Sequence, residues 1–368
     1  MRKRIAIVHE FFNKMGGAER TLLSMLNALD GFDVEVFLLQ ADSYLVKEHL
    51  SGFKVHLSAV HKSPKFLSQK NRLWLPFYPL LIESFDFSSF DIVISSSNSF
   101  AHGVITNSKT THITYYHSPC RYLWDWKNEY EKENNFGLLK KIIARFLLHK
   151  QRKWDFLASM RADLVLANSK TVQARIQKYY RRESELLYPP VNTGDGSVNM
   201  QKQNYYLLAS THTPYKKIDI AIEAFNKLGT RLKIAGTGKD TERLKKMANS
   251  NIEFLGFVTD NQLWKLMENA RAFIFPGVED FGITPVEAMG RGCPVIAKNK
   301  GGLSETVING QTGLLYNGES DDLQNAIIEF ESQTIIDPND CVKQATNFNE
   351  ENFKKRFRKL IEKHAETI

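Results

Sequence analysis

The chain has 368 residues, 42% of them hydrophobic, and this length predicts two domains that each bury a core of their own. Only three cysteines are present, Cys120, Cys293 and Cys341, and this odd, sparse set excludes a disulfide framework and favours a reducing cytoplasm. The formal net charge of +8 favours an acidic partner, but no RRM, KH or helix-turn-helix signature accompanies it, so nucleic acid is not the expected one.

Short apolar runs rich in β-branched residues alternate with amphipathic stretches along the chain, and the pattern occurs twice. It is typical of a parallel α/β sheet in each half. The expected strands cover residues 4–8, 34–39, 91–96, 112–116 and 163–167 in the first half and 205–209, 231–235, 252–256, 272–276 and 294–298 in the second. The stretch Ala18–Leu29 predicts a helix. The stretch 350–365 carries apolar residues at helical spacing and predicts a second amphipathic helix.

The loop after the first expected strand contains Gly16 and Gly17, directly before a helix that opens at Ala18. At this position an open parallel sheet exposes backbone N–H groups to a ligand. A paired glycine is also common in an ordinary turn, and that alternative stays open. His117 follows the strand 112–116, so it projects at the carboxyl edge of the same sheet, where a lone histidine is more often structural than a ligand contact.

A turn-rich segment, YPPVNTGDGS at residues 188–197, separates the two halves. Its paired prolines stiffen the chain and its two glycines loosen it, as expected of a linker. The predicted organisation is therefore a first domain over residues 1–187, a second over 188–349 and a C-terminal helix over 350–368.

Lys216 and Lys217 follow the first expected strand of the second half. A lysine there supplies a point charge that can stabilise a phosphate, although two lysines alone are equally typical of a solvated helix. After the next strand, Gly236-Thr237-Gly238 resembles the start of a dinucleotide fingerprint. Thr241 stands at the third glycine position, so NAD binding is not expected.

The segment 273–302 reads as an apolar strand, a loop with two glutamates, a helix, a second strand and a paired glycine. Pro285 after Thr284 marks a helix start. The backbone N–H groups of Gly282, Ile283 and Thr284, together with the positive end of the helix dipole, suit a diphosphate.

Two glutamates, Glu279 and Glu287, flank that turn. A carboxylate accepts hydrogen bonds from hydroxyls, so one glutamate can hold a ribose and the other a sugar ring. Two plainer interpretations stay open: Thr284 and Glu287 form a T-x-x-E capping box, and Glu279 with Asp280 is a solvated acidic loop. The several glycines of the segment gather at one sheet edge and favour the ligand-binding interpretation.

These motifs resemble those of the retaining family-four glycosyltransferases of the GT-B fold. The resemblance rests on E-DFGITPV-E, AMGRGCPVIA and GGLSETVINGQTGLLY, and it extends to RIAIVHEFFNKMGGAER, DIVISSSNSFAHGV, YYHSPCRYLWD, ANSKTVQARIQKYY, LLYPPVNT and PYKKIDIAIEAF. The HSPCRYLWD segment is most similar to bacterial mannosyltransferase-like members that build O-antigen and other surface polysaccharides. The resemblance implies two Rossmann-like domains whose parallel sheets face a central cleft, with the C-terminal helix crossing back to the first domain.

The resemblance also implies roles for residues of this chain. At the reaction centre, His117 is expected to contact the donor sugar, Lys216 to neutralise the leaving diphosphate and Glu279 to hold the sugar. Gly17 and Arg121 are expected on the acceptor side. The donor-binding set, whose last member is expected to hold the ribose, comprises Gly16, Gly17, Thr211, Lys216, Lys217, Gly236, Gly282, Ile283, Thr284 and Glu287.

The chain departs from the family at one position of this site. Thr211 stands where the family has an arginine that joins the lysine in neutralising the leaving diphosphate. Either Lys217, His212 or Arg121 compensates for the missing charge, or activity is weak.

The implied function is transfer of a hexose from a nucleotide sugar, GDP- or UDP-linked, to a hydroxyl of a glycan or lipid-linked acceptor in surface polysaccharide biosynthesis. Mannose from GDP-mannose is the first choice of donor, retention of the anomeric configuration is expected, and no metal or other cofactor is expected. Two alternatives stay open. One is a nucleotide-sugar phosphorylase or epimerase of the same fold, and the other is a non-catalytic nucleotide-sugar-binding subunit.

Two segments mix basic and large apolar residues: 62–72, which leads into LWLPFYPLLI, and 140–154. Such segments can lie in the headgroup layer of an anionic membrane, and the alternative is that their apolar faces are core. No apolar run approaches the roughly 20 residues that span a bilayer, and the run after Arg4 is too short for a signal core. The expected location is the cytoplasm, with peripheral attachment to the inner face of the cytoplasmic membrane.

Overall fold

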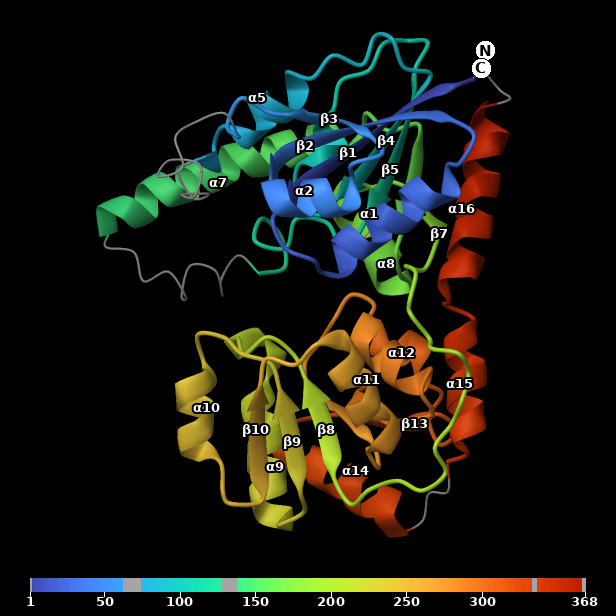
Figure 1. Cartoon of the computed structure of the whole chain (residues 1–368). Coiled ribbons are helices and arrows are strands. Elements are labelled where there is room, and N and C mark those ends of the chain that lie inside the picture. The colour runs from blue at the N-terminus through green and yellow to red at the C-terminus, as the bar shows by residue number, and fades with distance from the viewer. Residues whose placement is uncertain (1, 62–73, 127–137, 333–335, 366–368) are drawn as a thin grey trace. The chain divides into compact units, whose positions relative to one another are not determined.

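The computed structural model describes residues 2–61, 74–126, 138–332 and 336–365. The chain forms two compact units: Met1–Tyr188 with Phe353–Ile368, and Pro189–Asn352. Each unit contains one parallel sheet with helices packed around it (Figure 1). The predicted pair of parallel α/β domains is confirmed.

The first unit has a seven-stranded sheet in the order β3-β2-β1-β4-β5-β6-β7. Its strands are β1 (Arg4–Phe12), β2 (Asp33–Ala41), β3 (Lys54–Leu57), β4 (Ile92–Ser97), β5 (Thr111–Tyr116), β6 (Leu164–Ala167) and β7 (Glu185–Leu186). Its helices are α1 (Gly17–Ala28), α2 (Ser43–His49), α5 (Tyr78–Glu83), the short 3₁₀ turn η1 (Ala101–Gly103), α7 (Leu138–Ser159) and α8 (Lys170–Tyr180). The central strand β1 is buried over six consecutive residues, as expected of a parallel strand that is covered on both faces.

The second unit has a six-stranded sheet in the order β10-β9-β8-β11-β12-β13. Its strands are β8 (Tyr206–Ala209), β9 (Leu232–Ala235), β10 (Ile252–Gly256), β11 (Phe273–Phe275), β12 (Val295–Lys298) and β13 (Gly313–Tyr316). Its helices are η2 (Pro214–Lys216), α9 (Ile218–Leu228), α10 (Thr241–Met247), α11 (Asp260–Asn269), α12 (Ile283–Met289), α13 (Leu303–Thr306), α14 (Ser320–Ser332) and α15 (Pro338–Thr346). Strand β8, the first of this unit, lies between β9 and β11, so the chain first adds strands on one side of β8 and then on the other. Ligands bind beside such a reversal of strand order in open α/β sheets.

The C-terminal helix α16 (Glu350–Ala365) completes the core of the first unit. Phe353, Phe357 and Ile361 lie four residues apart along the helix, so they share one face. All three are buried in the cluster that contains the apolar side chains of β1 and α1. Arg358 also donates to the backbone carbonyls of Ala28 and Asp30, which end α1.

The start of α12 differs from the expected one. The helix begins at Ile283, after Gly282 at φ 92°, and not after Thr284. Gly282 is the residue that suits this left-handed backbone conformation, and it has no side chain to cap the helix. The capping box of Thr284 and Glu287, one of the two plainer interpretations of this segment, is therefore wrong.

Candidate active site

The loop between β11 and α12 is held by contacts between backbones. A Cβ added at Gly301 would lie 2.3 Å from the carbonyl oxygen of Glu279, and one added at Gly302 would lie 2.3 Å from Cα of Phe281. The N–H of Gly302 donates to the carbonyl of Glu279 at 2.9 Å. The glycine pair is thus required by close packing, and it fixes the loop that carries Glu279.

The three amide groups predicted for a diphosphate lie at the start of α12. The first hydrogen bond of this turn runs from the N–H of Val286 to the carbonyl of Gly282. The N–H groups of Gly282, Ile283 and Thr284 have no acceptor within the described part of the chain. Unpaired N–H groups in a first helical turn carry partial positive charge. Their contact with a diphosphate stays a prediction.

Lys216 and Glu279 are brought together by the fold. Lys216 ends η2, and its Nζ forms a hydrogen bond and an ion pair with Oε1 of Glu279. Both side chains remain partly exposed, at 17% and 25%. A Cβ at Gly277 would lie 3.0 Å from the carbonyl oxygen of Lys216, so the two loops approach closely. The structure therefore assembles a cation and a carboxylate from segments that are 63 residues apart.

Glu287 is buried on α12, with 5% of its surface exposed. Its backbone carbonyl accepts a hydrogen bond from Arg291, one turn later, at 3.0 Å. The guanidinium of Arg291 also stacks on the ring of Trp264 at 4.4 Å and donates to the carbonyl of Asn192. Sequence analysis did not identify Arg291 as a partner of this helix, because its contacts come from segments distant in the chain.

The structure excludes His212 as the group that supplies the positive charge missing at Thr211. His212 is fully buried, and its Nδ1 bonds to Oγ1 of Thr241 at 2.9 Å. Burial lowers the pKa of His212 below its ordinary value, so the ring is neutral at neutral pH and does not supply the missing charge. Thr211 and Lys217 are both exposed, and Lys217 has a left-handed backbone, at φ 56°.

Close packing of the backbone requires a glycine at position 236, which the sequence alone did not indicate. Its φ is 118°, and a Cβ at this position would lie 2.0 Å from the carbonyl oxygen of Ser210. A Cβ at Gly238 would lie 2.2 Å from the carbonyl oxygen of His212. The Gly-Thr-Gly segment therefore allows the loops after β8 and β9 to touch, and its contact with a donor stays a prediction.

In the first unit, Gly16 and Gly17 open α1. Gly16 is the N-cap, with extended backbone, and its carbonyl accepts from the N–H of Arg20 at 3.0 Å. A Cβ at Gly16 would lie 2.9 Å from Oε2 of Glu19. The glycine pair therefore lies at a strand-to-helix turn, as the sequence indicated, and its role in ligand binding stays a prediction.

His117 directly follows β5 and is 9% exposed. Its Nε2 lies 2.8 Å from Oγ of Ser96 on β4. Burial, and to a lesser degree the nearby His9, lowers the pKa of His117 from 6.5 to about 3. The imidazole is therefore neutral at neutral pH, so it can exchange hydrogen bonds with hydroxyls but carries no charge to offset a leaving diphosphate.

Arg121 lies in the turn that follows β5. Its guanidinium stacks on the ring of Trp126 at 4.8 Å. Its Nε is buried and has no hydrogen-bond partner within the described residues. The predicted acceptor-side role of Arg121 stays a prediction.

The sequence analysis treated the serines of β4 only as part of a strand, yet each is buried and bonded to a histidine. Ser95 Oγ lies 2.9 Å from Nε2 of His112, and Ser97 Oγ lies 3.0 Å from Nδ1 of His102. Ser97 also donates to Glu10, whose carboxylate accepts from the backbone N–H groups of residues 98–101. A polar run inside a fully buried strand was the signal, because buried hydroxyls need partners.

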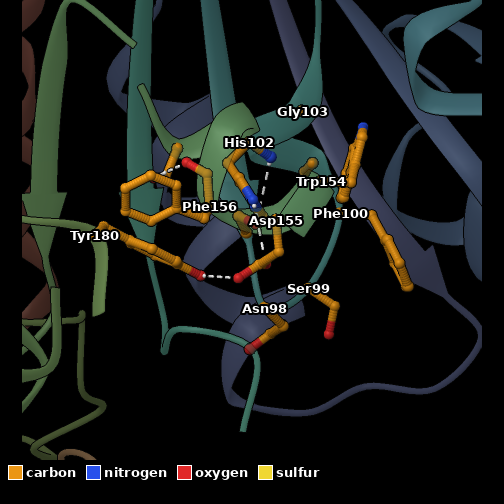
Figure 2. A network of polar contacts seen from close by, with 12 residues as sticks. Asn98, Ser99, Phe100, His102, Gly103, Trp154, Asp155, Phe156 and Tyr180 are labelled. Carbon is orange, nitrogen blue, oxygen red and sulfur yellow. Dashed lines mark hydrogen bonds and ion pairs between the residues drawn. The ribbon is translucent and has the colours of Figure 1, made fainter. Parts of the chain in front are cut away.

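His102 continues into a buried network beneath α7. Figure 2 shows His102, Asp155 and Tyr180 directed toward one another. His102 Nε2 lies 3.4 Å from Oδ1 of Asp155, and Oδ2 accepts from Tyr180 at 2.9 Å and from Trp124 Nε1 at 2.7 Å. Asp155 is 0% exposed, and Tyr180 and Trp124 replace the water that Oδ2 loses. Oδ1 has no hydrogen-bond partner among the described residues.

The buried histidines predict how stability depends on pH. His112 and His117 have pKa values of about 3, below the ordinary 6.5, mainly because of burial. Between pH 6.5 and 3 the unfolded chain binds more protons, so stability falls as the pH falls, and above 6.5 the two histidines add no further dependence. We expect the free energy of unfolding of the first unit to drop by about 4 kcal/mol from pH 7 to pH 5.

Urea unfolding at several pH values measures this dependence, and the same denaturant slope m at pH 7 and pH 5 excludes partial unfolding as the cause. His112→Gln is expected to halve the pH dependence, whatever its effect on stability at pH 7. A wild-type stability that is flat between pH 7 and pH 5 contradicts the neutral, buried state of these histidines.

Among the described residues, no three His, Cys, Asp or Glu side chains gather in a way that could hold a metal ion. The expected independence from metal stays a prediction.

Comparison with known proteins defines the class of fold. Sucrose-phosphate synthase from Thermosynechococcus elongatus aligns with a TM-score of 0.76 over 98% of this chain and 99% of its own, at 17% identity. Anabaena Alr3699/HepE, solved in complex with UDP, aligns with a TM-score of 0.71 over 99% of this chain and all of its own, at 18% identity. The chain therefore has the GT-B fold.

Two family profiles match consecutive parts of the chain. The profile described as Glycosyltransferase Family 4 matches residues 15–195, and that described as Glycosyl transferases group 1 matches residues 195–348. The chain belongs to these glycosyltransferases of group 1 and family 4.

Curated relatives share the sequence over about half of their length. Alpha-1,3/1,6-mannosyltransferase ALG2 of Dictyostelium discoideum is 27% identical over 237 residues, 50% of this chain and 56% of the relative. O-antigen chain mannosyltransferase RfbU of Salmonella typhimurium is 30% identical over 186 residues, which are 47% of this chain and 51% of the relative. An uncharacterized glycosyltransferase of Methanocaldococcus jannaschii, MJ1178, is 28% identical over 206 residues, which are 54% of this chain and 57% of the relative.

Proposed function

We propose that this protein transfers a hexose from a nucleotide sugar to an acceptor hydroxyl and retains the anomeric configuration. The observation that carries the proposal is the pairing of Lys216 with Glu279 on a loop that leads into three unpaired amide groups of α12. A cation and amide donors suit a diphosphate, and a carboxylate suits sugar hydroxyls. The names of ALG2 and RfbU support mannose, and the UDP complex of Alr3699/HepE supports a nucleotide sugar as donor.

The proposed reaction is a same-face displacement. The acceptor oxygen bonds to the anomeric carbon on the side from which the diphosphate leaves, and the bond between that carbon and the phosphate oxygen breaks. The leaving phosphate takes the proton of the acceptor hydroxyl. Lys216 stabilises the charge that develops on the leaving oxygen, which is the main electrostatic contribution of this chain. Turnover in excess EDTA tests the absence of a metal requirement, and no loss is expected.

A thermal-shift screen with GDP-, UDP- and ADP-sugars tests the donor. A ligand at 100 times its Kd adds about 2.7 kcal/mol of stability, so the true donor raises the Tm clearly above the others. GDP-mannose is the expected donor, within a surface-polysaccharide pathway. The anomeric configuration of the product, read by NMR, tests retention, and an inverted product would overturn the same-face mechanism.

The same experiments separate the rival functions. Turnover of the sugar nucleotide without an acceptor favours a phosphorylase or an epimerase. Tight donor binding without nucleotide release, for any acceptor, favours a non-catalytic subunit. The observation that favours a non-catalytic subunit is Thr211, which stands where the family has an arginine.

Glu279→Ala and Glu287→Ala are expected to differ in kind. If Glu287 holds the ribose, its loss weakens binding of the free nucleoside diphosphate. If Glu279 holds the sugar, its loss spares nucleotide affinity and lowers turnover. The loss of stability that a capping box would have added at Glu287 is not expected, because α12 starts at Ile283. Calorimetry with GDP measures both affinities, and equal, full affinity in both variants rules out the assignment.

We also propose that the protein attaches to the surface of an anionic membrane through α7. Ile142, Ile143 and Phe146 are 58%, 51% and 57% exposed on this helix, which an aqueous surface does not favour. Lys150 lies over the ring of Phe146 at 4.7 Å, so basic and apolar groups are interleaved. Leu148 is buried, so the helix is core on one face only.

The neighbouring α5 has the same division. Tyr78 and Ile82 are buried in the core, whereas Phe77 and Leu80 are 51% and 64% exposed. Trp154 of α7 donates to Glu83 of α5 at 2.7 Å, so the two helices pack together. Residues 62–72, which the sequence also indicated, lie outside the described residues. No described helix has the length and apolarity of a membrane span.

Sedimentation with anionic vesicles tests this proposal. Basic residues near such a surface contribute about 1 kcal/mol each and are screened by salt, so binding is expected at low salt and release at high salt. Changing Lys140, Lys141 and Arg145 to glutamate is expected to abolish binding and to spare turnover of a soluble acceptor. The matched control changes the exposed Lys343, Lys355 and Lys359 to glutamate and is expected to retain more binding. Wild-type protein that ignores vesicles at low salt contradicts the proposal.

A further inference from the structure

Four side chains from separate elements of the first unit form a chain of contacts that ends at His117. His9 on β1 places its Nδ1 3.1 Å from Oγ of Ser96 on β4, and the same oxygen lies 2.8 Å from Nε2 of His117. The other ring nitrogen of His9, Nε2, lies 3.9 Å from Oε1 of Glu19 on α1. His9 and Ser96 are 1% and 0% exposed, so water does not complete these contacts.

The number of available protons fixes the direction of each contact. The Ser96 hydroxyl has one hydrogen, so it donates to one ring nitrogen and accepts from the other. The ring nitrogen of His9 that faces the Glu19 carboxylate carries the N–H, because a lone pair there would face negative charge. With the ring hydrogen of His9 on Nε2, Nδ1 presents a lone pair and accepts the Ser96 hydrogen.

The consequence passes to His117. Since Ser96 donates to His9, it accepts from His117, and Nε2 of His117 must carry the hydrogen. A neutral imidazole with a protonated Nε2 has a lone pair on Nδ1. That Nδ1 has no protein partner among the described residues.

We propose that Glu19, His9 and Ser96 are positioning residues that fix His117 as its Nε2–H tautomer, which makes Nδ1 an acceptor for a hydroxyl of the bound sugar. The identity of that hydroxyl rests on the proposed function, whereas the tautomer does not. The neutral state of His117 agrees with its lowered pKa, about 3. This arrangement favours a ligand that donates an O–H to His117 over one that presents only an acceptor.

Two-bond ¹⁵N–¹H correlation spectra of protein labelled at histidine test the tautomer directly, in the full chain and without substrate. The His117 signals are assigned by their loss in His117→Asn. Wild-type His117 is expected to show a protonated Nε2 and an unprotonated Nδ1 at pH 7. A protonated Nδ1, or an equal mixture of the two tautomers, overturns the proposal.

Variants test whether Glu19, His9 and Ser96, together called the relay, fix the tautomer of His117. Ser96→Ala and Glu19→Gln are expected to lose the single tautomer, and Ser96→Thr, which keeps the hydroxyl, is expected to retain it. Ser95→Ala is the matched control, because the neighbouring serine bonds to His112 and not to His117. A His117 spectrum that is unchanged in Ser96→Ala overturns the role of the relay.

A kinetic comparison connects the tautomer with the proposed function. Wild type is expected to lose about two- to tenfold in kcat/KM on a deoxy donor that lacks the contacted hydroxyl, and Ser96→Ala is expected to lose much less on the same change. Equal losses in both proteins contradict the sugar contact. If the spectra agree but no nucleotide sugar binds, the proposed function fails and the tautomer assignment stands.

Discussion

Replacing Lys216 by alanine is expected to lower kcat about 10²–10³-fold, the loss seen when a group that stabilises developing charge is removed from an active site. The expected effect is large because Thr211 leaves the site without the family arginine, while burial leaves His212 and His117 uncharged. Lys216 is then the cation that the described loop at β11 holds in place, through Glu279.

Initial rates at saturating donor measure this prediction. The matched control is Lys217→Ala, which removes the same charge from the adjacent, exposed residue and is expected to change kcat only a few-fold. Because the pair of Lys216 with Glu279 is partly exposed, its loss is expected to cost at most about 1 kcal/mol of stability. Full turnover in Lys216→Ala would show that leaving-group stabilisation comes from elsewhere.

Replacing Asp155 by alanine is expected to lower the free energy of unfolding of the first unit by about 2–6 kcal/mol, because two hydrogen-bond donors each lose their acceptor at about 1–3 kcal/mol. The carboxylate has no exposed surface and is approached by His102, Tyr180 and Trp124. Its removal leaves the hydroxyl of Tyr180 and the indole N–H of Trp124 without an acceptor.

Chemical denaturation followed by tryptophan fluorescence measures this loss. Asp155→Asn keeps the volume and removes the charge, so it separates the effect of the carboxylate from simple cavity formation. Asp30→Ala removes an exposed carboxylate from the same unit and is expected to stay within about 0.5 kcal/mol of wild type. An Asp155→Ala protein as stable as wild type would mean that the network contributes nothing net.

The sequence predicted every strand that has a neighbour on both sides, and also the edge strand β10. Each of the ten expected runs is a strand, and the central ones are largely apolar because a parallel strand covered on both faces is buried. β3, β7 and β13 were not predicted. They are edge strands of two to four residues, and a short strand with one neighbour gives too little periodicity to identify.

The candidate site was predictable in part. The two glutamates and the presence of a helix between them were indicated because glycine and proline mark the segment, whereas the start of the helix at Ile283, with Gly282 as N-cap, was missed because a serine or threonine is the usual signal. The pairing of Lys216 with Glu279 and the serine–histidine contacts of β4 depend on strands that meet only in the folded sheet. Local pattern carries no information about such partners.

The packing of α16 also determines the order in which the two units can finish folding during synthesis. The helix supplies three buried residues to the core of the first unit, whose preceding segment ends at Tyr188, about 165 residues before Phe353. At about 5–20 residues per second, the ribosome takes roughly 8–33 s to cover that interval. Throughout this interval, in which the second unit is being made, the apolar surface that α16 covers lacks its helix. Asn352, the last residue of the second unit, is made before Phe353, so the second unit has its complete chain before the first does. The domain that is translated first therefore finishes folding last.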